Sequence, residues 1–248
     1  MSKYKDDFKK AKEENRLFVE HIGETVDKTL NLINEERSGK QLGLYSRWNG
    51  VNRGILKYFR FGDLILIAGA SGSGKSYLLN MLEEDFTDTG GINKDFPYEI
   101  VVLSFKFEMK ATHEVSRNIS RYISKSYGYI MSSEWRNEEG EYNSITDEEF
   151  QFISDQAEKF KTRNVFYVET AGNLKEMWAT RAYMAKEFPK AKFVITLDHS
   201  LLSKRLNEKD DNELLANLSK VFNEWKKYFG DLIVVIGQLN GDIEQPIR

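Results

Sequence analysis

The sequence has no cysteine and only three prolines and three histidines among its 248 residues. The lack of cysteine excludes disulfide bonds and thiolate-bound zinc. No apolar run approaches the roughly 20 residues of a membrane-spanning helix. The charged start, Met1-Ser2-Lys3-Tyr4-Lys5, is unlike a signal peptide. These absences predict a cytoplasmic protein (in the host cytoplasm if the protein is viral) with no membrane partner.

The sequence also lacks an excess of positive charge, since its formal net charge is −3. The whole chain therefore has no general attraction to nucleic acid, and any such binding needs a local basic patch or one assembled between subunits. Hydrophobic residues make up 40% and charged residues 30% of the chain, which is ordinary for a globular protein. The length suits one α/β domain with an appendage.

One glycine-rich stretch dominates the sequence: Gly69-Ala70-Ser71-Gly72-Ser73-Gly74-Lys75-Ser76. Its spacing is that of a phosphate-binding P-loop, the Walker A motif, and it lies between an apolar run predicted as a strand and a predicted helix. The glycines let successive N–H groups point at phosphate oxygens, and the helix N-terminus adds a positive dipole. We expect these eight residues to bind a nucleoside triphosphate, with Lys75 at its β- and γ-phosphates and Ser76 on Mg²⁺.

Apolar runs predict a first strand at 64–68 and four more at 99–105, 165–168, 192–198 and 231–237. Helices are predicted between them at 112–126, 147–161, 173–188 and 212–228, with capping residues Thr146 and Asn173 opening two of them. This alternation predicts an α/β fold with a mainly parallel sheet flanked by helices. The first of these helices is expected to bury Val115, Ile119, Tyr122 and Ile123.

Three polar residues follow strands at the edge that carries the P-loop, where parallel sheets bind their ligands. Asp198 is expected to hold the metal's water shell beside Ser76, since Mg²⁺ needs few protein oxygens. Glu108 is expected to polarise the attacking water as a catalytic base. Gln238 has the donors and the acceptor to sense a γ-phosphate. His199 is interpreted as a structural histidine.

Two further segments leave alternatives open. An amphipathic helix is predicted from Leu17 to near Ser38, with a stripe that includes Ile22, Val26 and Leu30. It either packs on its own domain or docks on a neighbouring subunit. The second segment is a basic-polar loop, which is either solvated or contacts nucleic-acid phosphates. Its candidate DNA-binding residues are Lys204, Arg205, Asn207 and Lys209.

Several segments in order resemble the RecA-like ATPase domain of DnaB-type replicative helicases. They are Gly43–Gly50, Gly62–Gly69, Ser104–Met109 with Glu108, Ile195–Leu202 with Asp198, and Ile236–Gln245 with Gln238. The resemblance implies a RecA-like P-loop NTPase that forms a hexameric ring, hydrolyses ATP between subunits and translocates on single-stranded DNA during replication. It implies a primase or loader as a further partner. It also places Lys204–Asp211 as a pore-facing DNA loop and Leu17–Arg37 as a linker helix on the adjacent subunit.

We expect residues 1–40 to form the N-terminal segment with the linker helix and residues 41–248 to form the ATPase domain. Departures from the family are His199, where tyrosine is usual, and an end at Arg248, before the family's last strand and its basic finger. Without a finger, turnover is expected to be slow, unless Arg248 or another basic residue takes its place. Two alternatives stay open: an ATPase that loads or remodels other proteins without unwinding, and an ATP-binding assembly subunit with little turnover.

Overall fold

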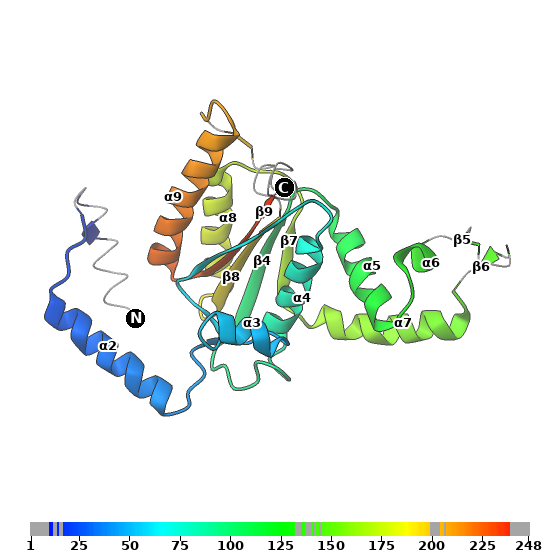
Figure 1. Ribbon diagram of the computed structural model, residues 1–248, viewed down its shortest axis with the longest axis horizontal. Helices are drawn as coiled ribbons and strands as arrows, with labels where there is room; N and C mark the ends of the chain where they lie inside the picture. Colours follow the sequence, from blue (N-terminus) through cyan, green and yellow to red (C-terminus); the bar gives the residue numbers. More distant parts are fainter. Residues whose placement is uncertain are drawn as a thin grey trace, which may run out of the picture.

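The computed structural model describes residues 10–11, 14, 17–131, 135–136, 140, 142–143, 145–198, 204–205 and 207–238. Its centre is a five-stranded parallel sheet in the order β3-β9-β8-β4-β7 (Figure 1). The strands are β3 (Leu64–Gly69), β4 (Ile100–Lys106), β7 (Val165–Val168), β8 (Lys192–Asp198) and β9 (Leu232–Gln238). The predicted α/β fold with a parallel sheet flanked by helices is confirmed.

Helices cover both faces of this sheet (Figure 1). α4 (Lys75–Thr87) packs on one face, and α8 (Leu174–Glu187) and α9 (Asp211–Phe229) pack on the other. The strands supply both cores by alternation: in β4, Leu103 joins the core under α8 and α9, whereas Val102 joins the core under α4. Because both faces are covered, all seven residues of β4 are buried.

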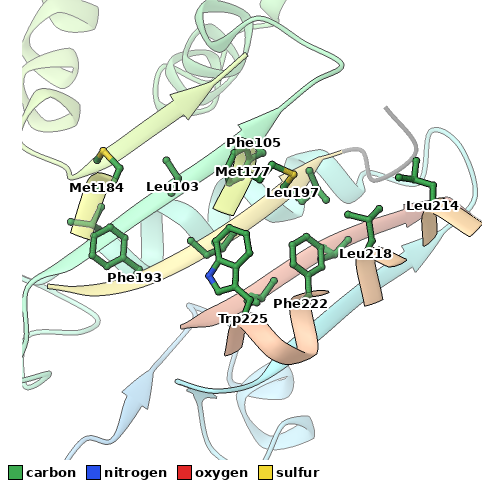
Figure 2. Close-up of a cluster of buried hydrophobic side chains, with 14 residues drawn as sticks. Leu103, Phe105, Met177, Met184, Phe193, Leu197, Leu214, Leu218, Phe222 and Trp225 are labelled. Atoms are coloured by element: carbon green, nitrogen blue, oxygen red, sulfur yellow. The ribbon is translucent and has the colours of Figure 1, made fainter. Parts of the chain in front are cut away.

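The core beneath α9 shows how the sequence pattern becomes packing. Leu214, Leu218, Phe222 and Trp225 recur every three or four residues and point together at the sheet (Figure 2). Each is at most 3% exposed, so each contributes on the order of 1.5–3 kcal/mol by burial. The helix begins after Asp210, whose carboxylate accepts from the Glu213 N–H, and it ends at Gly230 with the left-handed φ of 69°.

The chain before β3 forms a small substructure and a projecting helix. β1 (Gly43–Leu44) pairs antiparallel with β2 (Phe59–Arg60), with α3 (Asn49–Gly54) between them. α2 (Ile22–Arg37) starts later than the predicted Leu17, after His21 as its N-cap, and points away from the sheet (Figure 1). No residue of α2 is buried against the described part of the chain, which contradicts the alternative in which this helix packs on its own domain.

A second group of elements extends from the β7 edge (Figure 1). It contains α5 (Ala111–Tyr122), α6 (Tyr127–Met131), α7 (Asp147–Lys161) and the hairpin β5–β6 (Trp135–Arg136 and Tyr142–Asn143). The predicted apolar face of α5 is wrong in part: the buried residues are Glu114 and Asn118, whereas Val115, Ile119 and Ile123 are half-buried and Tyr122 is 39% exposed. The predicted caps at Thr146 and Asn173 are confirmed, each in a complete capping box. Over the described ranges, no helix is long and apolar enough to cross a membrane.

Candidate active site

The P-loop joins the end of β3 to the start of α4, and its glycines take the conformations that other residues avoid. Gly72 and Gly74 have φ values of 74° and 85°, in the left-handed region. Gly74 is also the N-cap of α4, so the loop turns directly into a helix N-terminus. A Cβ atom at Gly69 would lie 2.8 Å from the Ser73 hydroxyl oxygen, which would have to move. The Lys75 ammonium donates to the Ala70 carbonyl oxygen at 2.6 Å.

The loop opens into a cavity of about 330 Å³ that gathers the residues predicted from the strand ends. Glu108, Asp198 and Gln238 all line it, together with five of the eight P-loop residues, whereas Gly69, Ala70 and Ser73 are not among its lining residues. The full lining is Ser71, Gly72, Gly74, Lys75, Ser76, Tyr77, Glu108, Arg117, Asp198, Ile236 and Gln238. Four neighbouring strands thus deliver their carboxyl ends to one place, as expected for a ligand site in a parallel sheet.

The strand order explains why these particular residues meet. β9 lies directly beside β3, and the register sets Gln238 beside Gly69 at the edge. β8 follows and brings Asp198, whose register partner on β4 is Lys106. Glu108 lies two residues beyond Lys106, so it reaches the cavity from β4, which of the four contributing strands lies farthest from β3.

The donor set at this edge fits Mg²⁺ rather than a transition metal. Ser76 and Asp198 line the same cavity and offer a hydroxyl and a carboxylate, the hard oxygen ligands that Mg²⁺ prefers. Asp198 is only 4% exposed and occupies the last position of β8. The part of the chain that the structure describes contains no cluster of three or more acidic or histidine side chains that could cage a metal. A magnesium ion here would keep several waters.

Arg117 is a lining residue that the sequence analysis missed. It belongs to α5, where apolar spacing pointed to the wrong buried face. The guanidinium of Arg117 interacts electrostatically with the carboxylate of Glu114, which lies one turn earlier on the same helix. α5 begins at Ala111, three residues after Glu108, so the sequence places this helix near the edge, but which of its residues face the cavity depends on its buried face.

Glu114 is buried beneath this edge, with 1% of its surface exposed. Burial raises the pKa of its carboxyl group, and the negative charges of Glu83 and Asp198 act in the same direction, while Lys106 and Arg117 oppose them. One of its oxygens accepts from the Asn80 amide, and the other has no partner among the described residues. The layer of side chains beneath the site is therefore rich in carboxyl groups and largely excluded from solvent.

The described residues of the basic loop after β8 are not among those that line the cavity. Lys204 and Arg205 are exposed, and the Arg205 guanidinium pairs with Asp211. Asn207 and Lys209 are exposed as well, and their backbone N–H groups donate to Glu208 and Glu213. The four candidate DNA-binding residues therefore lie outside the cavity. His199 and the residues after Gln238 lie outside the described residues.

Comparison with known proteins agrees with this geometry. The family described as DnaB-like helicase C terminal domain matches residues 43–247. A solved structure of a DnaB-like replicative helicase, reported with its interactions with primase, superposes with a TM-score of 0.73 at 16% identity, covering 90% of this chain and 51% of that one. A second solved structure, described as an ATPase domain, superposes with a TM-score of 0.67 at 14% identity, covering 90% and 74%. This chain thus spans about half the length of the first structure. No curated protein matches.

Proposed function

The chain belongs to the family of DnaB-like helicase C-terminal domains, and on that premise we propose that it is the ATP-dependent motor of a DNA helicase. The observation that carries the proposal is the cavity lined jointly by the P-loop, Glu108, Asp198 and Gln238. A binding loop alone needs no carboxylate beside its phosphates. A carboxylate that can orient water and an amide that can contact the γ-phosphate are groups that hydrolysis of a bound triphosphate uses.

In this proposal the P-loop residues from Gly69 to Ser76 bind the phosphates through their N–H groups, and Lys75 contacts the β- and γ-phosphates. Ser76 and Asp198 hold the metal, which supplies charge neutralisation at the phosphate oxygens. Glu108 orients the attacking water and accepts its proton, since it is an exposed carboxylate at the cavity wall. Gln238 distinguishes the triphosphate from the diphosphate.

Arg117 adds a cation to this scheme. A guanidinium at the cavity wall is suited to the equatorial oxygens of a transferring phosphoryl group, where charge develops. It comes from the same chain as the P-loop, whereas the resemblance assigns the finger to a neighbour. We therefore give Arg117 part of the charge neutralisation and leave the rest to an adjacent subunit.

The proposed partners use two further surfaces. The exposed apolar stripe of α2 docks on the adjacent subunit of a hexameric ring. Residues 1–40 then serve as the linking segment and residues 41–248 as the ATPase domain. Single-stranded DNA contacts the loop that carries the exposed residues Lys204, Arg205, Asn207 and Lys209, and a primase or loader completes the assembly.

An ATPase assay with and without single-stranded DNA tests the proposal. The protein should hydrolyse ATP with Mg²⁺, and DNA should stimulate the rate. Lys75→Ala should lose ATP binding, because the phosphates lose their lysine. Glu108→Gln should bind ATP normally and lose about 10²–10⁴ in kcat, the usual contribution of a general base.

The competing functions give different results in the same assay. A rate of ATP hydrolysis that single-stranded DNA does not change, with no ring formed in the presence of nucleotide, would favour an ATPase that remodels other proteins. ATP binding without hydrolysis in the wild-type protein would favour an assembly subunit. Either result overturns the helicase proposal, and unaltered turnover in Glu108→Gln would overturn the assignment of the base.

A further inference from the structure

A lysine is completely buried directly beneath the candidate active site. Lys106, the last residue of β4, is 1% exposed and does not line the nucleotide cavity. Lysine is almost never buried to this degree unless its charge is paired. Its ammonium donates to the Asn80 side-chain oxygen at 2.7 Å and lies 3.4 Å from a Glu83 carboxylate oxygen. Both partners belong to α4, the helix that begins with the P-loop lysine.

The contacts of Lys106 continue into the elements that support the site. Glu83 accepts from the Ser104 hydroxyl of β4 at 2.7 Å and from the Thr196 hydroxyl of β8 at 2.6 Å. Asn80 donates to Glu114 of α5, and both side chains are at most 2% exposed. These six side chains, which we term the Lys106 cluster, join α4, β4, β8 and α5. The cluster consists of Asn80, Glu83, Ser104, Lys106, Glu114 and Thr196.

The position of the cluster relative to the site is set by two periodicities. Asn80 lies four residues after Ser76, one turn further along the same face of α4. Lys106 lies two residues before Glu108 and beside Asp198 of β8. The Lys106–Asn80 hydrogen bond therefore joins β4 to α4 directly beneath the cavity that Ser76, Glu108 and Asp198 line.

We propose that Lys106 is a positioning residue for ATP hydrolysis, which fixes the end of β4 against α4 and so sets the distance from Glu108 to the P-loop. The proposal rests on the function proposed above, because it assumes that Glu108 acts on a bound triphosphate. Stability alone does not call for this residue, since buried ion pairs can often be replaced by apolar residues without a stability penalty. A charged hydrogen bond gives what an apolar contact lacks: a fixed direction and distance.

The test is Lys106→Met, which keeps most of the length of the side chain and removes the charge. Single-turnover hydrolysis should slow by roughly 10- to 100-fold, because a misplacement of about 1 Å can cost about 100-fold. The equilibrium affinity for a fluorescent ATP analogue should change by less than about threefold, as expected when only the transition state is affected. A double-mutant cycle with Glu108→Gln should be strongly non-additive, with little further decrease in rate when both residues are changed.

A matched control is the buried Arg181–Asp231 ion pair, which is held by hydrogen bonds of 2.6 and 2.8 Å on the other face of the sheet. Asp231 precedes β9 and so lies at the opposite edge from the cavity. Arg181→Met should lower the thermal stability and leave kcat of the folded fraction unchanged. If Lys106→Met folds poorly, Lys106→Met/Glu83→Gln removes both charges together, and the same slow hydrolysis is expected.

Three outcomes would overturn the inference. They are an unchanged kcat in Lys106→Met, an equal decrease in rate in the wild-type and Glu108→Gln backgrounds, or a comparable decrease in kcat in Arg181→Met. Wild-type protein that neither binds nor hydrolyses ATP would instead overturn the proposed function itself, so the two failures are distinguishable.

Discussion

At the scale of single residues, the least expected feature is that polar side chains form the layer beneath the site. Glu114 and Asn118 are the fully buried residues of α5, and each has a side-chain oxygen without a partner in the described part of the chain. Lys106 supplies a compensating charge near Glu114. Buried polar groups of this kind are costly unless they are satisfied, so their presence marks a site where geometry matters more than stability.

Glu114 yields a prediction about pH. Its folded-state pKa is raised above the ordinary 4.5, mainly by burial. A raised pKa means that the folded protein binds the proton more tightly than the unfolded chain does. The stability contribution is therefore complete below the ordinary pKa and disappears as pH rises through the raised value. Glu114→Gln should remove this dependence. The free energy of unfolding of the variant should therefore increase relative to that of the wild type as pH rises.

Urea unfolding at several pH values between about 4 and 8 measures this difference. Glu187→Gln is the control, because Glu187 is exposed on α8. Its free energy of unfolding should follow the wild-type pH dependence. A constant difference between Glu114→Gln and the wild type at all pH values would contradict the prediction.

At the scale of elements, α2 is amphipathic but buries none of its residues against the described part of its own chain. Ile22, Val26, Leu30 and Ile33 are between 47% and 69% exposed. The helix is tied to the domain near its C-terminal end, where Glu36 pairs with Lys57 at 3.1 Å. A stripe of this kind at i, i+4 and i+8 is typical of a helix that docks on another surface.

The double variant Val26→Gln/Leu30→Gln should therefore separate folding from assembly. Glutamine is a good helix former and both positions are exposed, so the stability of the monomer should change by only about 0.5 kcal/mol. Association in the presence of an ATP analogue should be strongly weakened. Thermal unfolding and sedimentation velocity measure the two effects. Asn31→Gln, at an exposed polar position on α2, should leave both unchanged, and wild-type-like association in the double variant would contradict the docking role.

At the scale of the whole molecule, the net charge of −3 opposes binding to a polyanion. Lys204 and Arg205 place two exposed positive charges in one loop, and Arg205 is already paired with Asp211. DNA binding should therefore depend on several copies of this loop acting together, and it should weaken steeply with salt. Lys204 should matter more than Arg205, because the Arg205 charge is already shared with a carboxylate.

Fluorescence anisotropy of labelled oligo-dT, measured with an ATP analogue at several salt concentrations, tests this expectation. Lys204→Ala should weaken binding and reduce the salt slope by about 0.7 for each phosphate that the lysine no longer neutralises. Lys190→Ala, at an exposed position in the turn before β8, is the control and should leave the slope unchanged. A slope in Lys204→Ala equal to that of the wild type would be evidence against the DNA-loop assignment.

Much of the fold could be predicted from local signals. The five strands and the capping boxes at Thr146 and Asn173 are properties of short segments, and the structure confirms them. The buried face of α5 could not be predicted from apolar spacing, because a polar cluster takes the place of the usual hydrophobic face. Arg117 was missed for the same reason, since its direction depends on that face.

The P-loop and the residues that end the strands could be identified from the chain alone, because both depend on short-range backbone geometry and on residue type. Which strand ends meet was set by the packing of distant segments. β9, the last of the five strands in chain order, lies between β3 and β8 and brings Gln238 beside Gly69. The burial of Lys106 against α4 and the exposure of the α2 stripe likewise depend on long-range packing. Local periodicity does not encode such packing, because it records only which residues share a face and not what that face meets.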